Sequence, residues 1–328
     1  MRKFMHALVG VFLTVLLLCT VSCSDEAVYD DGTLKIVTTA FPPYDFARQI
    51  AEGTNGVEVT MLLPPGSESH DYEPSVSDIA TVGKADLIIC IGGETDSWID
   101  GVIKASESKA SVLRLTDMVE LLEEDETVLV TSEDGHHGHS HEHSHKHTEE
   151  CTFDEHVWTS PENAAVMTEK IASAMCRLSE SDSETFRKNC EAYASSLREV
   201  QVEMKKLTAE CDSPVLIFAD RFPFRYLADS LGVKCYAAFA GCASDSEATL
   251  EAVYRLCKLA EENGSEVIFT CEFSSRNAAD LISRETGCEV RELHSCHNVS
   301  KEDFDGGVTY LSLMRRNLQY LKEAMCKK

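Results

Sequence analysis

Basic residues are scarce in this chain of 328 residues, because 30 lysines and arginines stand against 56 aspartates and glutamates, a formal net charge of −26. Binding to nucleic-acid phosphates depends on Lys and Arg, so this balance argues against a nucleic-acid partner. CxxC pairs are absent from the sequence as well. An acidic surface suits a soluble protein with a cationic ligand, although it also serves solubility alone.

Long apolar runs are also scarce, and the one at the N-terminus has the composition of an export signal. It extends from about Phe4 to Leu18, after the basic Arg2 and Lys3, and small or polar residues follow it. The run is too short to make a convincing membrane-spanning helix. Residues 1–22 are therefore predicted to be a signal peptide.

The signal ends in Thr20-Val21-Ser22-Cys23, which resembles a bacterial lipobox. In a lipobox the cysteine becomes the lipidated first residue, so Cys23 is the predicted lipidation site of an extracytoplasmic, membrane-anchored or periplasmic protein. Thr20 stands where leucine is usual. Plain cleavage and secretion is the alternative.

The fourteen cysteines would ordinarily suggest disulfides in an exported protein. Once Cys19 and Cys23 are set aside, the rest show no dense framework spacing. Several of them, such as Cys90, Cys190 and Cys257, fall at apolar-periodic positions. Most are therefore predicted to be small buried hydrophobic residues.

Short β-branched runs alternate with helical patterns in two parts of the chain. Strands are expected at 34–39, 57–63, 86–93, 111–116, 215–219, 233–239, 266–271 and 289–293. Apolar runs bounded by Gly, Pro and Asp are typical of strands buried on both faces of a parallel sheet. The predicted fold class is α/β, with two (βα)4-type lobes at residues 33–181 and 211–328.

A regular apolar stripe separates the two predicted lobes. Its members recur at intervals of four and three: Phe186, Cys190, Tyr193, Leu197, Val200, Met204, Leu207 and Cys211. The stripe predicts one helix over 182–210, about 40 Å long at 1.5 Å per residue. A stripe flanked by two lobes favours a rigid bridging helix that packs on both, rather than an independent coiled coil.

Residues 134–148 form a histidine-rich segment inside the first predicted lobe. Its histidines are His136, His137, His139, His141, His143, His145 and His147. The surrounding composition cannot form a core, which predicts a surface loop. The alternation of histidines suits weak, reversible zinc collection. A dispensable low-complexity insert is the alternative.

Potential metal ligands follow the predicted strands of both lobes. His70 comes after the strand at 57–63, and His294 directly follows the strand at 289–293. Asp220 and Glu272 follow two further strands of the second lobe. Ligands gather at the carboxyl ends of parallel strands, so these groups are expected to face one interlobe cleft. Imidazole and carboxylate together suit Zn²⁺ or Mn²⁺.

Two stretches resemble signatures of a known family. "LLPPGSESHDYEPSVSDI" (62–79) resembles the segment around the first metal histidine in substrate-binding proteins of bacterial zinc and manganese ABC transporters, the ZnuA and TroA kind. "DEHVWTSPENA" (154–164) resembles the second, with Glu155 in place of the usual proline. "AAFAGCASDSEATLEAV" (237–253) and "EVIFTCEFSSRNAADLI" (266–282) follow the pattern of the second lobe.

The resemblance covers residues 34 to 326 and implies a function as well as a fold. It implies two α/β lobes, a bridging helix and an interlobe metal site. It further implies a monomer that captures Zn²⁺ outside the cytoplasm and delivers it to an ABC-transporter permease. Members of this kind often carry a histidine-rich insertion before the second motif. An adhesin role is known for such surface lipoproteins, but no residue here indicates one.

The resemblance assigns His70 and His156 as metal ligands and reveals two departures. Arg221 stands where zinc-binding members place a third histidine, and an arginine cannot bind a cation. His294 stands where many members have an aspartate. The predicted ligand set is therefore His70, His156 and His294, with Glu272, Asp220 or water as the fourth ligand. Three neutral imidazoles favour zinc over manganese.

Two other classes of function stay open at this point. Three histidines and an open position also describe a catalytic zinc, so a metallohydrolase is the enzymatic alternative. Against it, the sequence offers no evident general base beyond Glu272 and Asp220. A passive metal store that uses only the histidine-rich loop is the third alternative.

Overall fold

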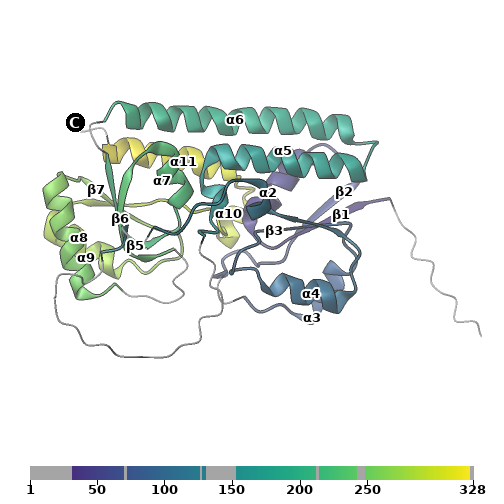
Figure 1. The fold of residues 1–328 in the computed structure, drawn as a ribbon, viewed down its shortest axis with the longest axis horizontal. Coiled ribbons are helices and arrows are strands. Elements are labelled where there is room, and N and C mark those ends of the chain that lie inside the picture. Colours follow the sequence, from purple (N-terminus) through teal and green to yellow (C-terminus); the bar gives the residue numbers. More distant parts are fainter. Residues whose placement is uncertain are drawn as a thin grey trace, which may run out of the picture. The chain divides into compact units, whose positions relative to one another are not determined.

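In a computed structural model of the protein, the described residues are 32–69, 72–125, 128–130, 153–211, 214–241 and 248–325. The predicted signal peptide, Cys23, His70 and the histidine-rich segment lie outside them. Leu34–Lys328 forms one compact unit, which contains every helix and strand described below (Figure 1). None of the described helices is long and apolar enough to cross a lipid bilayer.

The first lobe is built on a four-stranded parallel sheet in the order β2-β1-β3-β4. Its elements are β1 (Leu34–Thr38), α2 (Phe41–Ile50), β2 (Val57–Met61), α3 (Val76–Val82), β3 (Leu87–Cys90), α4 (Trp98–Ser106), β4 (Ser111–Arg114) and the 3₁₀ turn η1 (Leu115–Met118). Strand β3 is buried along its whole length, as expected for the centre of a covered parallel sheet.

The second lobe repeats this topology, because its parallel sheet has the order β6-β5-β7-β8. Its elements are β5 (Val215–Phe222), α7 (Arg225–Leu231), β6 (Lys234–Ala240), α8 (Leu250–Asn263), β7 (Val267–Thr270), α9 (Asn277–Thr286), β8 (Glu289–Glu292), α10 (Lys301–Asp305) and α11 (Tyr310–Met325). In each lobe the third strand pairs with the first on the side opposite the second, which is the topological switch point where ligands bind. The α/β fold class predicted from the sequence is confirmed.

One long helix, α6 (Ser183–Ala209), runs along both lobes (Figure 1). The 3₁₀ turn η3 (Val157–Thr159) and α5 (Pro161–Leu178) precede it. From Phe186 to Leu207, the apolar stripe of α6 is buried. A single hydrophobic cluster contains Ile36 of β1, Met204 of α6 and Phe218 of β5, so the two lobes share one core. The bridging helix is therefore part of the core.

Buried thiols contribute to this interior. Cys90, Cys190 and Cys257 are buried and take part in no disulfide. Burial raises the pKa of the Cys190 thiol to about 11, so at neutral pH it stays protonated and apolar in character. These positions agree with the prediction that the cysteines act as small hydrophobic residues.

A buried carboxylate joins three helices from distant parts of the chain. Asp45 of α2 is fully buried and accepts a hydrogen bond from Tyr193 Oη of α6 at 2.7 Å. It accepts another from the backbone N–H of Tyr310, the first residue of α11, at 2.8 Å. Arg48 Nη2 lies 2.5 Å from its other oxygen. Asp45 therefore ties α2, α6 and α11 together.

Replacing Asp45 by alanine is expected to reduce the free energy of unfolding by about 3 kcal/mol. The substitution leaves the Tyr193 hydroxyl and the Tyr310 N–H without their acceptor, at about 1–3 kcal/mol for each unsatisfied buried group. Urea denaturation followed by circular dichroism measures the loss. Asp305→Ala is the control, because it removes an ion pair with Lys301 whose two side chains are exposed, and a change within about 0.5 kcal/mol is expected. Equal losses in the two variants would contradict the role given to Asp45.

Candidate metal centre

A cleft opens between the lobes at the carboxyl ends of the strands. Its lining includes Glu68 and Ser69 after β2, His156 before η3, Arg221 near the end of β5, Glu272 after β7 and His297 after β8. Both sheets therefore contribute side chains to one site. This is where the switch points of two parallel sheets place a ligand.

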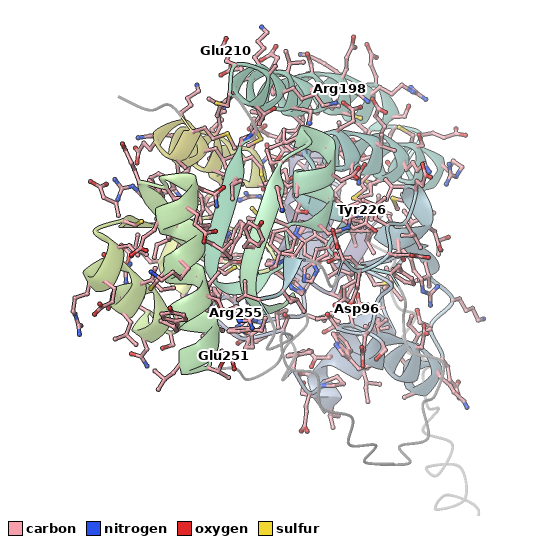
Figure 2. The ribbon with its side chains drawn as sticks, turned by 60° about the vertical axis from the view of Figure 1, so that its left-hand side comes forward. Asp96, Arg198, Glu210, Tyr226, Glu251 and Arg255 are labelled. Atoms are coloured by element: carbon pink, nitrogen blue, oxygen red, sulfur yellow. The ribbon has the colours of Figure 1, made fainter. Side chains whose placement is uncertain are left out.

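His156 is held in the cleft by the residues around it. It is almost fully buried, and its Nδ1 lies 3.1 Å from Asp154 Oδ1, which also accepts the His156 backbone N–H at 2.8 Å. Asp154 is fixed in turn by Tyr226 of α7, labelled near the middle of Figure 2, whose hydroxyl donates to the Asp154 carbonyl at 2.7 Å. The Asp154 contact engages Nδ1, so Nε2 of His156 is the nitrogen that would meet a metal ion.

Acidic neighbours set the protonation of His156. Burial lowers the pKa of this imidazole, but the carboxylates of Asp154, Glu155 and Glu272 together raise it above its ordinary value. A metal ion and a proton compete for the same ring. Proton competition at His156 therefore extends to a higher pH than at an isolated histidine.

His297 is the second imidazole in the cleft. It is buried, its Nδ1 lies 3.2 Å from Ser69 Oγ of the first lobe, and its carbonyl accepts the Phe41 N–H at 3.2 Å. The ring centroids of His156 and His297 are 6.0 Å apart and the rings are nearly perpendicular. Two imidazoles on one zinc ion, with Zn–N near 2.0 Å, have centroids roughly 5 Å apart. The two rings therefore need to approach by only about 1 Å to share an ion.

Trp158 packs against both imidazoles. Its ring centroid lies 5.3 Å from that of His156 and 4.9 Å from that of His297. The indole is fully buried and donates from Nε1 to the Ser295 carbonyl at 2.8 Å. Gly241 makes room on another side, since a Cβ there would lie 3.2 Å from His156 Cε1 and 2.8 Å from the Phe222 carbonyl. The rings are thus confined to a narrow range of orientations.

His294, a ligand in the set predicted from the sequence, does not line this cleft. Its backbone N–H donates to Asn317 of α11, whose side-chain N–H donates back to the His294 carbonyl. Its Nδ1 accepts the Cys296 N–H at 2.9 Å, so the neutral ring carries its proton on Nε2 and offers a metal no lone pair there. The geometry favours His297 over His294 as a ligand.

The two carboxylates considered as a fourth ligand are already engaged. Glu272 lines the cleft, but its Oε2 accepts the Ser295 N–H at 2.8 Å and its Oε1 accepts the Ser295 hydroxyl. Asp220 accepts the N–H groups of Arg221 and Cys271 at 2.8 and 2.9 Å, and it does not line the cleft. Burial raises the pKa of Asp220, although the hydrogen bonds that it accepts oppose this. Asp220 therefore fixes the ends of β5 and β7 rather than facing the site.

Glu155, which replaces the proline usual in the second motif, is a buried neighbour of His156 in the sequence. It is buried and its Oε2 accepts the Thr95 N–H at 3.1 Å. A Cβ at Gly93 would overlap this carboxylate, so the position requires glycine. Nearby, Asp96 (Figure 2) accepts from Thr39 Oγ1 at 2.7 Å and from the Gly92 N–H at 3.0 Å. Burial raises the pKa of both Glu155 and Asp96.

The remaining predicted ligands are not in the described part of the chain. His70, next in sequence after Ser69, and all histidines from His136 to His147 lie outside it. Among the described residues, no group of three or more His, Cys, Asp or Glu side chains is arranged to hold a metal ion. The spacing His141-Glu142-His143-Ser144-His145 formally matches the HExxH pattern, which works on a helix. It falls in the same low-complexity segment.

Two α/β lobes on a shared helical backbone, with imidazoles in the cleft between them, define the class of two-lobed solute-binding proteins. A model of the family described as "Zinc-uptake complex component A periplasmic" matches residues 36–324. This match spans most of the chain, and the chain therefore belongs to that family.

Known relatives agree with this assignment. The zinc-binding lipoprotein AdcA of Streptococcus pneumoniae is 29% identical over 307 residues, which cover 92% of this chain and 58% of the relative. The high-affinity zinc uptake system protein ZnuA of Bacillus subtilis is 28% identical over 325 residues, 99% of this chain and 98% of that protein. The chain thus spans little more than half of the streptococcal relative.

Solved structures show the same fold. The Zn(II)-bound ZnuA-like domain of Streptococcus pneumoniae AdcA has a TM-score of 0.71 and 26% sequence identity, covering 90% of this chain and all of that domain. The metal-dependent lipoprotein YcdH of Bacillus subtilis has a TM-score of 0.72 and the same identity and coverage. The family resemblance seen in the sequence motifs is confirmed.

Asp154→Asn is expected to lower the pKa of His156. The substitution removes the carboxylate that contributes most to raising this pKa, while the burial that lowers it remains. NMR titration of the imidazole signals of metal-free protein measures the shift, with Asp229→Asn on the outer side of α7 as the control. A His156 pKa that stays unchanged or rises in Asp154→Asn would contradict this reading of the site.

Proposed function

We propose that this protein captures Zn²⁺ outside the cytoplasm and delivers it to an ABC-transporter permease for uptake. The observation that carries the proposal is the pair of imidazoles, His156 and His297, in the interlobe cleft. Their ring centroids are 6.0 Å apart, and the chain belongs to a zinc-uptake family. The names of the relatives support zinc as the cargo. A signal peptide at residues 1–22 and lipidation at Cys23 would keep the protein at the membrane surface.

The proposed ligands are His70, His156 and His297. His297 takes the place given to His294 in the set predicted from the sequence, because Ser69 and Trp158 hold it in the cleft while His294 is bound to Asn317. Neutral imidazoles suit zinc better than manganese, whose sites are richer in carboxylate. Manganese transport is the alternative within the same family.

A zinc hydrolase is less well supported than a binding protein. The family is described as a zinc-uptake component. The two acidic candidates for a general base, Glu272 and Asp220, are both engaged by hydrogen bonds that hold the second lobe together. Turnover of an ester or peptide substrate by zinc-loaded protein, above the rate in buffer, would favour the hydrolase.

Single substitutions distinguish the two candidate histidines. His156→Ala and His297→Ala are each expected to weaken Zn²⁺ binding by more than about 100-fold, since even substitutions beyond the ligands cost 10- to 100-fold. His294→Ala is the matched control, from the same segment, and should leave the affinity within about threefold. Competition with a chromophoric chelator measures the affinities, and circular dichroism checks folding. A large loss in His294→Ala with none in His297→Ala would restore the ligand set predicted from the sequence.

Deleting residues 135–148 is expected to leave one tight Zn²⁺ site per chain. The histidine-rich segment is proposed to collect zinc weakly, so its loss should lower only the number of weakly bound ions. Equilibrium dialysis with metal analysis counts both classes of site, and a replacement of equal length in Gly and Ser controls for loop length. If the tight site disappears with the segment, the passive metal store becomes the better description.

A further inference from the structure

Arg221 and Glu68 face each other across the cleft. Arg221 is the penultimate residue of strand β5, and Glu68 is in the segment that follows β2 in the other lobe. Nη1 and Nη2 of the guanidinium each lie 3.4 Å from one oxygen of the carboxylate. Both side chains are partly buried, with exposed fractions of 18% for Arg221 and 31% for Glu68. Arg221, which cannot bind a metal ion, thus holds Glu68, which can, inside the site.

The Arg221–Glu68 pair is not at its closest approach. Guanidinium–carboxylate contacts are typically about 2.7–2.9 Å long, shorter than either contact here. Nε of Arg221 is buried and has no hydrogen-bond partner among the described residues. Of the two carboxylates that line the cleft, Glu272 is engaged on both oxygens by Ser295. Oε1 of Glu68 also accepts the Ser69 N–H at 3.1 Å and the Ser69 hydroxyl at 3.4 Å, whereas its Oε2 is held by Arg221 Nη2 at 3.4 Å. Glu68 can therefore move by a fraction of an ångström without losing Arg221.

The segment that carries Glu68 is docked on the segment that carries His297. The Gly66 N–H donates to the Val299 carbonyl at 2.8 Å, and the Asn298 side chain donates to the Ser67 carbonyl at 2.9 Å. The next residue after Glu68, Ser69, lies 3.2 Å from Nδ1 of His297. These contacts fix Glu68 and His297 relative to each other, although they come from different lobes.

We propose that Glu68 is a carboxylate ligand of the transported metal ion and that Arg221 is the residue that positions it. The proposal rests on the zinc-binding function proposed above. Ligating carboxylates are themselves hydrogen-bonded to a second group, so one oxygen of Glu68 would bind the ion while the other keeps its contact with Arg221. The negative charge of Glu68 also offsets the positive charge of Arg221. An incoming cation therefore meets no net positive charge from the pair. Arg221 cannot bind the ion itself, but it holds Glu68 where the carboxylate can bind it.

Glu68→Gln tests the ligand role. The substitution keeps the size of the side chain and removes its charge, and it is expected to weaken Zn²⁺ binding by more than about 100-fold, since substitutions beyond the ligands already cost 10- to 100-fold. In Co²⁺-loaded protein, loss of a carboxylate oxygen should shift the visible d–d absorption. Glu73→Gln, at an exposed glutamate of the same segment, is the control and should change neither. Wild-type affinity and an unchanged cobalt spectrum in Glu68→Gln would overturn the proposal.

Arg221→Lys tests the positioning role, because lysine keeps the charge but lacks the planar fork. It is expected to weaken Zn²⁺ binding several-fold in the wild-type background and to have no further effect in the Glu68→Gln background, as for residues that act through one another. Equal losses in the two backgrounds would mean that Arg221 acts independently of Glu68. That outcome would overturn its assigned role.

A comparison with His156→Ala separates this proposal from the one it rests on. Strong loss of zinc binding in His156→Ala, together with wild-type behaviour of Glu68→Gln, overturns the Glu68 assignment and leaves the proposed function standing. Wild-type binding in both variants overturns the interlobe site as a whole. Thermal unfolding of each metal-free variant shows that the fold is intact before binding is compared.

Discussion

The buried carboxylate of Asp45 is the contact on which the two lobes and the cleft depend. It joins α2, α6 and α11, and its partner Tyr310 also donates a hydrogen bond to the Trp158 carbonyl at 2.5 Å. Trp158 in turn packs against both cleft imidazoles. Phe41, at the start of the Asp45 helix, donates to the His297 carbonyl. Asp45 is therefore connected, through Tyr310 and Trp158, to the imidazoles that the two lobes bring together.

Most acidic groups near the cleft are engaged by the protein itself. Asp96, Asp154, Asp220 and Glu272 each accept at least one backbone N–H, at the ends of strands or in the turns that follow them. Such contacts satisfy orphan donors where parallel strands end. They also explain why a strongly acidic chain does not place a dense carboxylate cluster in its cleft. The cleft is lined by two imidazoles, His156 and His297, and two carboxylates, Glu68 and Glu272.

The fold could be predicted from the sequence more completely than the site. Each strand of the described residues overlaps a run predicted from the sequence. The central strands β3 and β7 are buried along their whole length and have the continuous apolar sequences expected of strands covered on both faces. His156 is predicted from the motif that surrounds it, and it lines the cleft. From the sequence, His294 is assigned as a ligand and His297 is not singled out, because the backbone turns between them through Cys296, which has a φ of +66°. That turn separates His294, whose backbone is hydrogen-bonded to Asn317 of α11, from His297, which lines the cleft, and no sequence spacing reveals it.

The shared core bears on how fast an ion can be exchanged. Separating the lobes would expose apolar surface, at a free-energy cost of about 25 cal/mol for every Å². Concerted motions of whole lobes take microseconds to milliseconds. The contacts between Pro64–Ser69 and the segment from His297 to Val299 are a small number of hydrogen bonds, partly or fully buried. Loops of this size rearrange in nanoseconds to microseconds. Opening this short segment would therefore be faster than separating the lobes.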